Sequence, residues 1–204
     1  MSRRLVVATR NPGKLRELSA LFAGAGYAAL DLTAAGVPER PAIEDSLEVH
    51  ATFEANARAK ARHFTALAGG LPVVADDSGL EVAALAGAPG VLSRRYFGFT
   101  GDAAAVDAAN RSALLERLAG AADRRARFVC AVVHVTGDRE LVAHGETTGA
   151  ITGAPRGSRG FGYDPIFLSD ELGCTFGEAT DEEKARVSHR ARAFAALLER
   201  LRAA

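Results

Sequence analysis

The sequence contains only two cysteines, Cys130 and Cys174, and they lie far apart. Neither belongs to a Cys-x-x-Cys motif, so the sequence indicates neither a zinc site nor a disulfide scaffold. No apolar run approaches the roughly 18 to 20 residues that a membrane span needs. The run at residues 5–8, behind two arginines, is too short for a signal-peptide core. We therefore expect a protein of the reducing cytoplasm that has no membrane partner.

The chain also lacks an excess of either charge, because 25 Lys and Arg residues balance 25 Asp and Glu residues. This balance excludes a polybasic nucleic-acid coat and an acidic tail, although a local basic cleft is compatible with it. Lysine itself is scarce, since only Lys14, Lys60 and Lys184 occur beside 22 arginines. These three are candidates for sites that need a compact ammonium, and chance survival on the surface is the alternative.

The chain of 204 residues, 48% of them hydrophobic, is long enough for one sizeable core or for two small lobes that share a sheet. Apolar patterning predicts strands at residues 5–8, 27–32, 71–75, 127–135 and 140–151. It predicts helices after Asn11, over 52–64, near 80–85, over 102–118, and at the C-terminal end, and a loop over 38–48. Strands thus mix with helices, and a turn at 137–138 predicts an antiparallel pair. The fold class is α/β, built around a mixed sheet.

The motif Thr9-x-Asn11-x-x-Lys14 joins the first predicted strand to a helix. Asn11 suits the N-cap, and Pro12 suits the first helical position. The N–H groups and positive dipole end of a helix N-terminus suit a phosphate, and Lys14 opposes the dipole unless an anion lies beside it. The motif indicates a phosphate site that is not a Walker P-loop, and a plain capped helix is the alternative.

Two further polar clusters precede and follow the third predicted strand. Asn56, Lys60 and His63 share one face of the helix predicted after Thr52, although most such stripes are simply solvated. Asp76-Asp77-Ser78-Gly79 follows the apolar run at 71–75, at a strand end where ligands of α/β proteins collect. Adjacent carboxylates of an extended chain point to opposite sides, so one can bind Mg²⁺ or activate water while the other contacts a different group. An Asp-rich turn that caps a helix is the alternative.

The C-terminal half has a segment in which glycines alternate with aromatic residues, Gly157-Ser158-Arg159-Gly160-Phe161-Gly162-Tyr163-Asp164. Glycine allows a close approach of the backbone, and an aromatic ring offers a face on which a base can stack. Lys184 and the run Ser188-His189-Arg190 supply donors suited to carbonyl acceptors on a ligand. Each of these signals is weak when taken alone.

Taken together, the motifs resemble the inosine triphosphate pyrophosphatase family, the Ham1-like enzymes. The matching segments, in the family's order, are ATRNPGKLRE, ATFEANARAKA, VADDSGLEV, GAPGVLSRRY, RGFGYDPIF and EEKARVSHR. They extend from one end of the chain to the other and contain all three lysines. The resemblance therefore favours a functional role for these lysines over chance.

The resemblance implies an enzyme that hydrolyses ITP, dITP and XTP to the monophosphate and pyrophosphate, and so removes deaminated purines from the nucleotide pool. It implies one domain over residues 1–204, with a long mixed β-sheet and helices that form two lobes around a nucleotide-binding cleft. It also implies a homodimer and Mg²⁺, or Mn²⁺ in its place, as cofactor. A purine nucleoside triphosphate is then the expected partner, and nucleic acid is not one.

Carried over by position, the resemblance implies a role for each matching residue. Asp77 and Glu48 bind the metal, Asp77 accepts the proton of the attacking water, and Asp76 and Lys14 complete the catalytic group. The residues implied at the phosphates are Thr9, Arg10, Asn11, Pro12, Gly13, Lys14 and Lys60. Those implied at the base or elsewhere on the substrate are Ser78, Phe161, which stacks on the base, Gly162, Tyr163, Asp164, Lys184, His189 and Arg190.

The sequence departs from the family's pattern at three positions. His50 stands where glycine is usual, and Glu44 and Asp45 lie close enough to Glu48 to compete with it as the metal ligand. Leu92 and Arg94 replace the usual Tyr and Ala, which affects the rim of the site or the dimer contact.

Two alternative functions remain. The first is a Maf-type pyrophosphatase, and the SHR and FGYD segments argue against it. The second is a non-catalytic nucleotide-binding protein, and the intact Asp76, Asp77 and Lys14 argue against it.

Overall fold

The protein is described by a computed structural model that covers residues 3–203, and its contacts divide the chain into two compact units. Unit 1 comprises the chain up to Asp77, Cys130–Gly145 and the chain from Arg190, and unit 2 comprises Ser78–Val129 and Glu146–His189. The strands are β1 (Arg3–Val7), β2 (Tyr27–Leu30), β3 (Val73–Val82), β4 (Arg125–Thr136), β5 (Arg139–Ile151) and β6 (Phe167–Ser169). They form one sheet in the order β2-β1-β3-β4-β5-β6, in which β1 is parallel to β2 and β3, and β6 is antiparallel to β5. The predicted α/β fold with a mixed sheet is confirmed.

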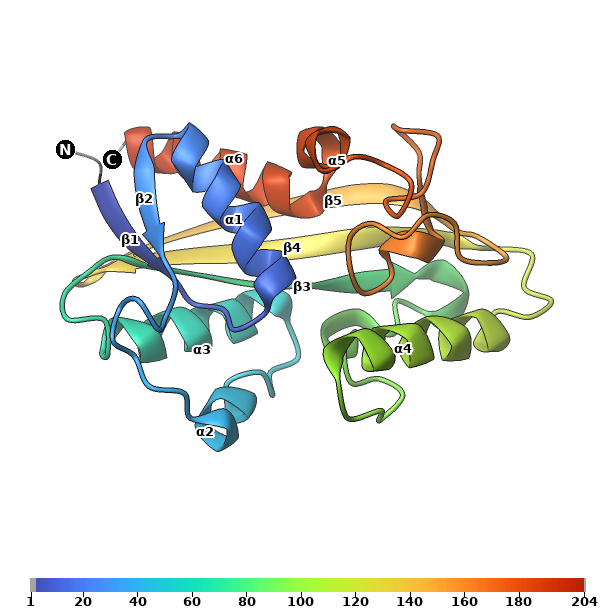
Figure 1. Ribbon diagram of the computed structural model, residues 1–204, viewed down its shortest axis with the longest axis horizontal. Helices are drawn as coiled ribbons and strands as arrows, with labels where there is room; N and C mark the ends of the chain where they lie inside the picture. The colour runs from blue at the N-terminus through green and yellow to red at the C-terminus, as the bar shows by residue number, and fades with distance from the viewer. Residues whose placement is uncertain (1–2, 204) are drawn as a thin grey trace. The chain divides into compact units, whose positions relative to one another are not determined.

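Unit 1 has helices on both faces of its part of the sheet. Its helices are α1 (Pro12–Gly24), α2 (Pro41–Ser46), α3 (Phe53–Thr65) and α6 (His189–Arg202), of which α6 begins at the last residue of unit 2. Because side chains alternate along a strand, Leu5 and Val7 of β1 pack with the core residues of α1 and α6, whereas Val6 packs with those of α3. Figure 1 shows α1 and α6 on one face and α3 on the other. The central strands of unit 1 are therefore buried on both sides.

Unit 2 is built around one long helix and a group of aromatic rings. Its helices are α4 (Ala103–Arg117) and α5 (Asp181–Val187), and its 3₁₀ turns are η1 (Ala83–Leu85), η2 (Gly90–Leu92) and η3 (Asp164–Ile166). Helix α4 is drawn in green in Figure 1. Its Leu114 is fully buried in a core with Phe128, Phe167 and Phe176. This core supports the glycine-rich segment that leads to η3.

The predicted helix starts agree with the structure because each depends on local contacts. Asn11, Thr52 and Asp102 cap α1, α3 and α4 with side-chain oxygens that accept backbone N–H groups. Thr180 and Glu183 form a capping box at the start of α5. Gly137 has a φ of +55°, as the tight turn between β4 and β5 requires. These elements follow from short-range sequence signals.

Two predictions about local structure are wrong. The predicted loop over residues 38–48 contains α2, whose first turn is stabilised by Pro41 and by a 3.1 Å bond from the N–H of Arg40 to Glu44. Strand β3 continues to Val82, so the helix predicted near residues 80–85 is only the turn η1. Leu80 and Val82 alternate into the core of unit 2, and this burial favours the strand over the turn that an Asp-Ser-Gly sequence indicates.

None of the helices within residues 3–203 combines the length and apolar character that crossing a membrane requires.

Candidate active site

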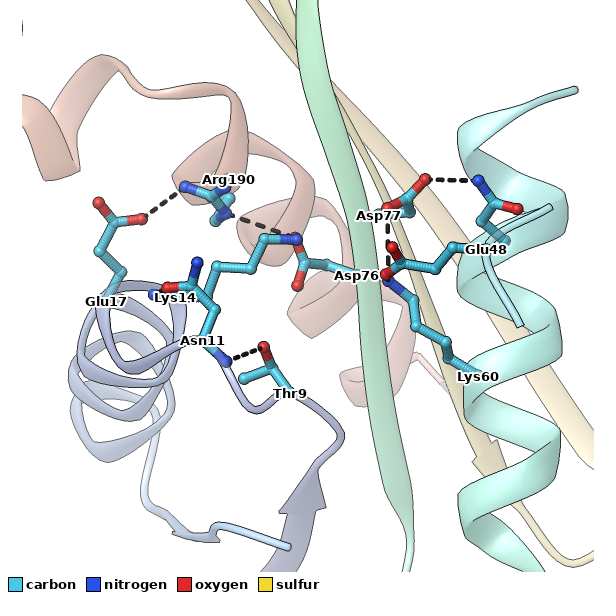
Figure 2. Close-up of polar contacts among 10 residues, drawn as sticks. Thr9, Asn11, Lys14, Glu17, Glu48, Lys60, Asp76, Asp77 and Arg190 are labelled. Carbon is cyan, nitrogen blue, oxygen red and sulfur yellow. Dashed lines mark hydrogen bonds and ion pairs between the residues drawn. The ribbon is translucent and has the colours of Figure 1, made fainter. Parts of the chain in front are cut away.

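Asp76 and Asp77 lie in the middle of β3 and not beyond its end. The predicted end of the strand before Asp76 is therefore wrong, and so is the alternative of an Asp-rich turn that caps a helix. Both are almost completely buried, with 2% and 6% of their surfaces exposed. Their carboxylates point to opposite sides of the strand, as predicted for adjacent residues of an extended chain (Figure 2). Each carboxylate therefore has its own set of partners from different helices.

The carboxylate of Asp76 forms ion pairs with two cations on its side of β3, Lys14 and Arg190. Its Oδ2 lies 2.9 Å from Nζ of Lys14 and 3.4 Å from Nε of Arg190, and Nη1 of Arg190 lies 2.8 Å from Glu17. Burial alone raises the pKa of a carboxyl group, but the charges of Lys14 and Arg190 outweigh burial and hold the pKa of Asp76 well below its usual range. Asp76 is therefore ionised at neutral pH and joins the first turn of α1 to α6.

The segment that precedes Lys14 has the geometry predicted for a capped helix. Oδ1 of Asn11 accepts the N–H of Lys14 at 3.0 Å, and Oγ1 of Thr9 accepts the N–H of Asn11 at 3.2 Å. Pro12 and Gly13 form the start of the first turn. The cation of Lys14 opposes the helix dipole, and the carboxylate of Asp76 relieves this conflict. The N-terminus of α1 thus carries an ammonium whose position is fixed by Asp76.

Asp77 lies beside α3, where it meets an amide and a second lysine. Its Oδ2 accepts Nδ2 of Asn56 at 2.9 Å, and its Oδ1 accepts Nζ of Lys60 at 3.3 Å. Nζ of Lys60 also lies 2.7 Å from Oε1 of Glu48. Burial lowers the pKa of a lysine, but the charges of Asp77 and Glu48 raise that of Lys60 above its ordinary value. Two residues of the polar stripe on α3, Asn56 and Lys60, are therefore buried beside Asp77. The alternative that this stripe is merely solvated is wrong for both residues.

The carboxylates of Asp77 and Glu48 form a donor set that fits a hard divalent cation. Both accept the same ammonium, that of Lys60, so their oxygens converge on one cation. Within residues 3–203, no three His, Cys, Asp or Glu side chains group as a metal site. Two carboxylates are nevertheless a usual protein contribution to Mg²⁺, which otherwise binds water and substrate phosphate oxygens. The residues present therefore fit the implied metal.

The three acidic residues considered as partners of Asp77 in metal binding, Glu44, Asp45 and Glu48, differ in their surroundings. Glu44 is bound by Arg10, whose Nε and Nη2 donate to its two oxygens at 3.2 and 3.0 Å. Although burial raises the pKa of Glu44, the Arg10 bonds lower it below the usual value. Asp45 is exposed on α2, and Glu48 alone of the three contacts Lys60 beside Asp77. This geometry favours Glu48 over Glu44 and Asp45 as the metal ligand. The guanidinium of Arg10 also donates to the carbonyl groups of residues 37 and 38.

Asn56 is a site residue that the sequence-based assignment omitted. Its Oδ1 accepts the N–H of His50 at 2.9 Å while its Nδ2 donates to Asp77. The amide thus ties the segment after Glu48 to the carboxylate on β3. His50, at the position of the usual glycine, has no positive φ, so the substitution causes no backbone strain. The shared helix face with Lys60 was the signal for Asn56, and asparagine is also scarce, since the sequence has it only at positions 11, 56 and 110.

In unit 2, the glycine-rich segment brings Phe161 and Asp164 together with Lys184 of α5. Nζ of Lys184 lies 2.7 Å from Oδ2 of Asp164, which also accepts the N–H of Phe161 at 2.8 Å. The same ammonium lies 5.0 Å from the centroid of the Phe161 ring, as in a cation–π contact. Gly160 has a φ of +73°, and any side chain there would clash with the Asp164 carboxylate. The predicted base-binding residues thus include a tightly packed Phe–Asp–Lys group.

The other predicted substrate residues have different neighbours. The His189 ring stacks on Phe128, with centroids 4.7 Å apart, and the Tyr163 hydroxyl donates to the carbonyl of Ser93 at 2.8 Å. Arg190, predicted to contact the base, directs its guanidinium to Glu17 and Asp76 in unit 1. Ser78 is the partly buried residue of β3 that follows Asp77.

We expect Asp76→Asn to lower the free energy of unfolding at pH 7 by about 3 kcal/mol or more, because it removes the buried counter-charge of Lys14 and leaves the buried Arg190 with Glu17 alone. Urea unfolding followed by circular dichroism measures this loss. Asp138→Asn, a change of the same chemistry at an exposed turn, should cost less than about 0.5 kcal/mol. A loss no larger in Asp76→Asn than in Asp138→Asn would contradict the structural role of Asp76.

The acid dependence of stability provides a second readout of the same substitution. Because the pKa of Asp76 is lowered by folding, its contribution is complete above the unfolded value of about 3.9. It declines as the pH falls below that value and is lost as the pH falls through the lowered pKa of the folded state. We expect this part of the acid slope to be missing in Asp76→Asn.

The chain is similar to known proteins in both sequence and structure. The sequence model of the Ham1 family matches residues 5–200. The dITP/XTP pyrophosphatase of Ralstonia nicotianae is 49% identical over 203 residues, which cover 98% of this chain and 97% of that protein. The HAM1 protein of Coxiella burnetii has a structure similar to this chain, with a TM-score of 0.82, 38% identity, and coverage of 99% and 100% of the two chains. A nucleoside-triphosphatase, or dITP/XTP pyrophosphatase, of Mycobacterium abscessus has a TM-score of 0.70 at 46% identity, with coverage of 96% and 98%. The chain therefore belongs to the Ham1 family.

Proposed function

We propose that the chain hydrolyses non-canonical purine nucleoside triphosphates, among them ITP, dITP and XTP, to the monophosphate and pyrophosphate. The observation that carries the proposal is the arrangement on β3, where Asp77 and Glu48 converge on Lys60 and Asp76 holds Lys14. The 49% identity to a dITP/XTP pyrophosphatase over nearly the whole of both chains supports the substrate class. The enzyme is a hydrolase of a phosphoric anhydride bond.

The residues around β3 suit the reacting end of such a substrate. Attack of water on the α-phosphorus breaks its bond to the bridging oxygen, and pyrophosphate leaves with increasing negative charge. Lys14 and Lys60 are the ammonium groups in unit 1 that can stabilise this charge. Asp77 is the carboxylate that orients the water and takes its proton. Asp76 holds Lys14 and Arg190, so it acts on the reaction through these cations.

We propose that Asp77 and Glu48 hold Mg²⁺, or Mn²⁺ in its place. When bound, such an ion neutralises phosphate oxygens and lowers the pKa of a coordinated water. The converging carboxylates support this assignment. The N–H of His50, held by Asn56, keeps the backbone beside Glu48 in place, and Lys60 remains available to a phosphate.

We propose that the Phe161 group of unit 2 recognises the base. Hypoxanthine and xanthine have a carbonyl oxygen at position six, where adenine has an amino group. A site with donors such as Lys184 and His189 accepts the oxygen, whereas adenine would leave a buried donor unpaired. Polar mismatches of this kind discriminate by several orders of magnitude. Phe161 supplies the ring face for stacking.

The remaining expectations are also proposals for this chain. We propose that the two units serve one nucleotide pyrophosphatase domain, that the enzyme acts as a homodimer in the cytoplasm, and that nucleic acids and membranes are not its partners. Free thiols at Cys130 and Cys174 agree with a reducing compartment. Exposed apolar side chains at Leu92 and Phe99 agree with a protein contact on unit 2.

The experiment that tests the function is pyrophosphate release from ITP, XTP, GTP and ATP, each with Mg²⁺ and with excess EDTA. We expect fast release from ITP and XTP, slow release from ATP because of the unpaired donor, and no release in EDTA. No release from any of the four would overturn the proposal. Release from modified pyrimidine triphosphates would then favour the Maf-type alternative, and nucleotide binding without release would favour a binding protein.

We expect Asp77→Asn to keep the fold and nucleotide binding but to lower kcat by roughly 10²- to 10⁴-fold, the usual contribution of a general base. The amide can still accept a bond from Asn56, and Lys60 keeps its contact with Glu48, so the loss of stability should be smaller than for Asp76→Asn. Steady-state kinetics and nucleotide titration by calorimetry measure the two effects. Asp138→Asn is again the control, and near-wild-type kcat in Asp77→Asn would remove Asp77 from the mechanism.

A further inference from the structure

Helix α4 holds Gly162, the residue after Phe161, through two charged side chains. Oδ2 of Asp107 accepts the N–H of Gly162 at 2.7 Å, and Nη1 of Arg111 donates to the carbonyl of Gly162 at 2.7 Å. Asp107 and Arg111 are four residues apart, so they lie on one face of α4. Both bonds are short and charge-assisted, the stronger class of hydrogen bond in proteins. We call this pair of contacts the α4 clamp.

The α4 clamp fixes a backbone conformation that glycine alone adopts easily. Gly162 has a φ of +58°, in the left-handed region. Its N–H belongs to the peptide group on one side of its Cα, and its carbonyl belongs to the peptide group on the other side. Because Asp107 holds the first group and Arg111 the second, the clamp restrains both torsions of Gly162.

Phe161 is consequently held at both of its peptide groups. Asp164 accepts the N–H of Phe161 at 2.8 Å, and the peptide group that follows Phe161 is the one held by Asp107. The Lys184 ammonium lies over the ring itself. The direction of the ring therefore depends on residues of α4, which were absent from the sequence-based site because their only signal was helical spacing.

We infer that Asp107 and Arg111 are positioning residues that set the ring of Phe161 for stacking and thereby the affinity for the base. The inference rests on the proposed function, since Phe161 is the proposed stacking residue. Neither residue contacts the phosphates in this account. Loss of the clamp should therefore weaken binding of the nucleoside part and leave recognition of the polyphosphate unchanged.

The test compares a substrate that has a base with an inhibitor that has none. In Asp107→Ala and Arg111→Ala we expect KM for ITP to rise about tenfold, the effect of one lost hydrogen bond to a charged group, with kcat within about twofold of the wild type. The inhibition constant of inorganic tripolyphosphate should stay within about twofold. Asp107→Asn, which keeps an acceptor oxygen, should recover most of the KM. Glu116→Ala and Arg117→Ala remove matched charges from exposed positions of α4 and should change neither constant.

A fluorescence measurement tests the clamp without relying on catalysis. The chain contains no tryptophan, so Phe161→Trp introduces a single reporter at the ring. We expect its steady-state anisotropy to fall when Asp107→Ala or Arg111→Ala is added, and not with Glu116→Ala. Unchanged anisotropy and unchanged KM, or parallel changes in KM and the tripolyphosphate constant, would overturn the inference. If no nucleotide were hydrolysed but the anisotropy still fell, the proposed function would fail while the clamp would stand.

Discussion

The buried ion group around Asp76 is the constraint on which the arrangement of unit 1 depends. A carboxylate in the centre of a sheet is costly unless cations and hydrogen bonds compensate for its desolvation. Lys14 from α1 and Arg190 from α6 supply that compensation. The same contacts attach the start of both helices to β3. The position of the α1 N-terminus, and of the ammonium that it carries, therefore follows from the charge of one aspartate.

The alternation of β3 then gives the neighbouring carboxylate a different task. Asp77 points to the other side of the strand, toward Lys60 and Glu48 (Figure 2). On that side it also accepts a hydrogen bond from Asn56. Glu48 and Asp77 share one cation, the ammonium of Lys60. This side of β3 therefore carries carboxylate oxygens and a positive charge next to one another. The partners of Asp76 and those of Asp77 thus lie on opposite sides of one strand. A shift of the strand register by one residue would exchange the two sets of partners.

Local signals in the sequence predicted much of the fold, whereas long-range contacts decided the rest. The caps Asn11 and Thr52 depend on bonds across three residues, and their helices begin where predicted. The continuation of β3 through Asp76 depends on cations 62 and 114 positions away along the chain, at Lys14 and Arg190. No local pattern contains that information. The contacts of Arg10 with Glu44 and of Asp107 with Gly162 are long-range in the same way, so the sequence motifs did not predict them.

The roles proposed for Asp76 and Asp77 can be tested directly by locating the divalent ion that the site is proposed to bind. The measurement is a crystal structure with Mn²⁺ and a non-hydrolysable analogue of ITP, in which anomalous scattering identifies the metal. The account predicts an anomalous peak from a metal ion that the carboxylates of Glu48 and Asp77 coordinate, with Asp76 still bound to Lys14 and Arg190. A metal ion coordinated by Asp76, or by Glu44 in place of Glu48, would contradict it.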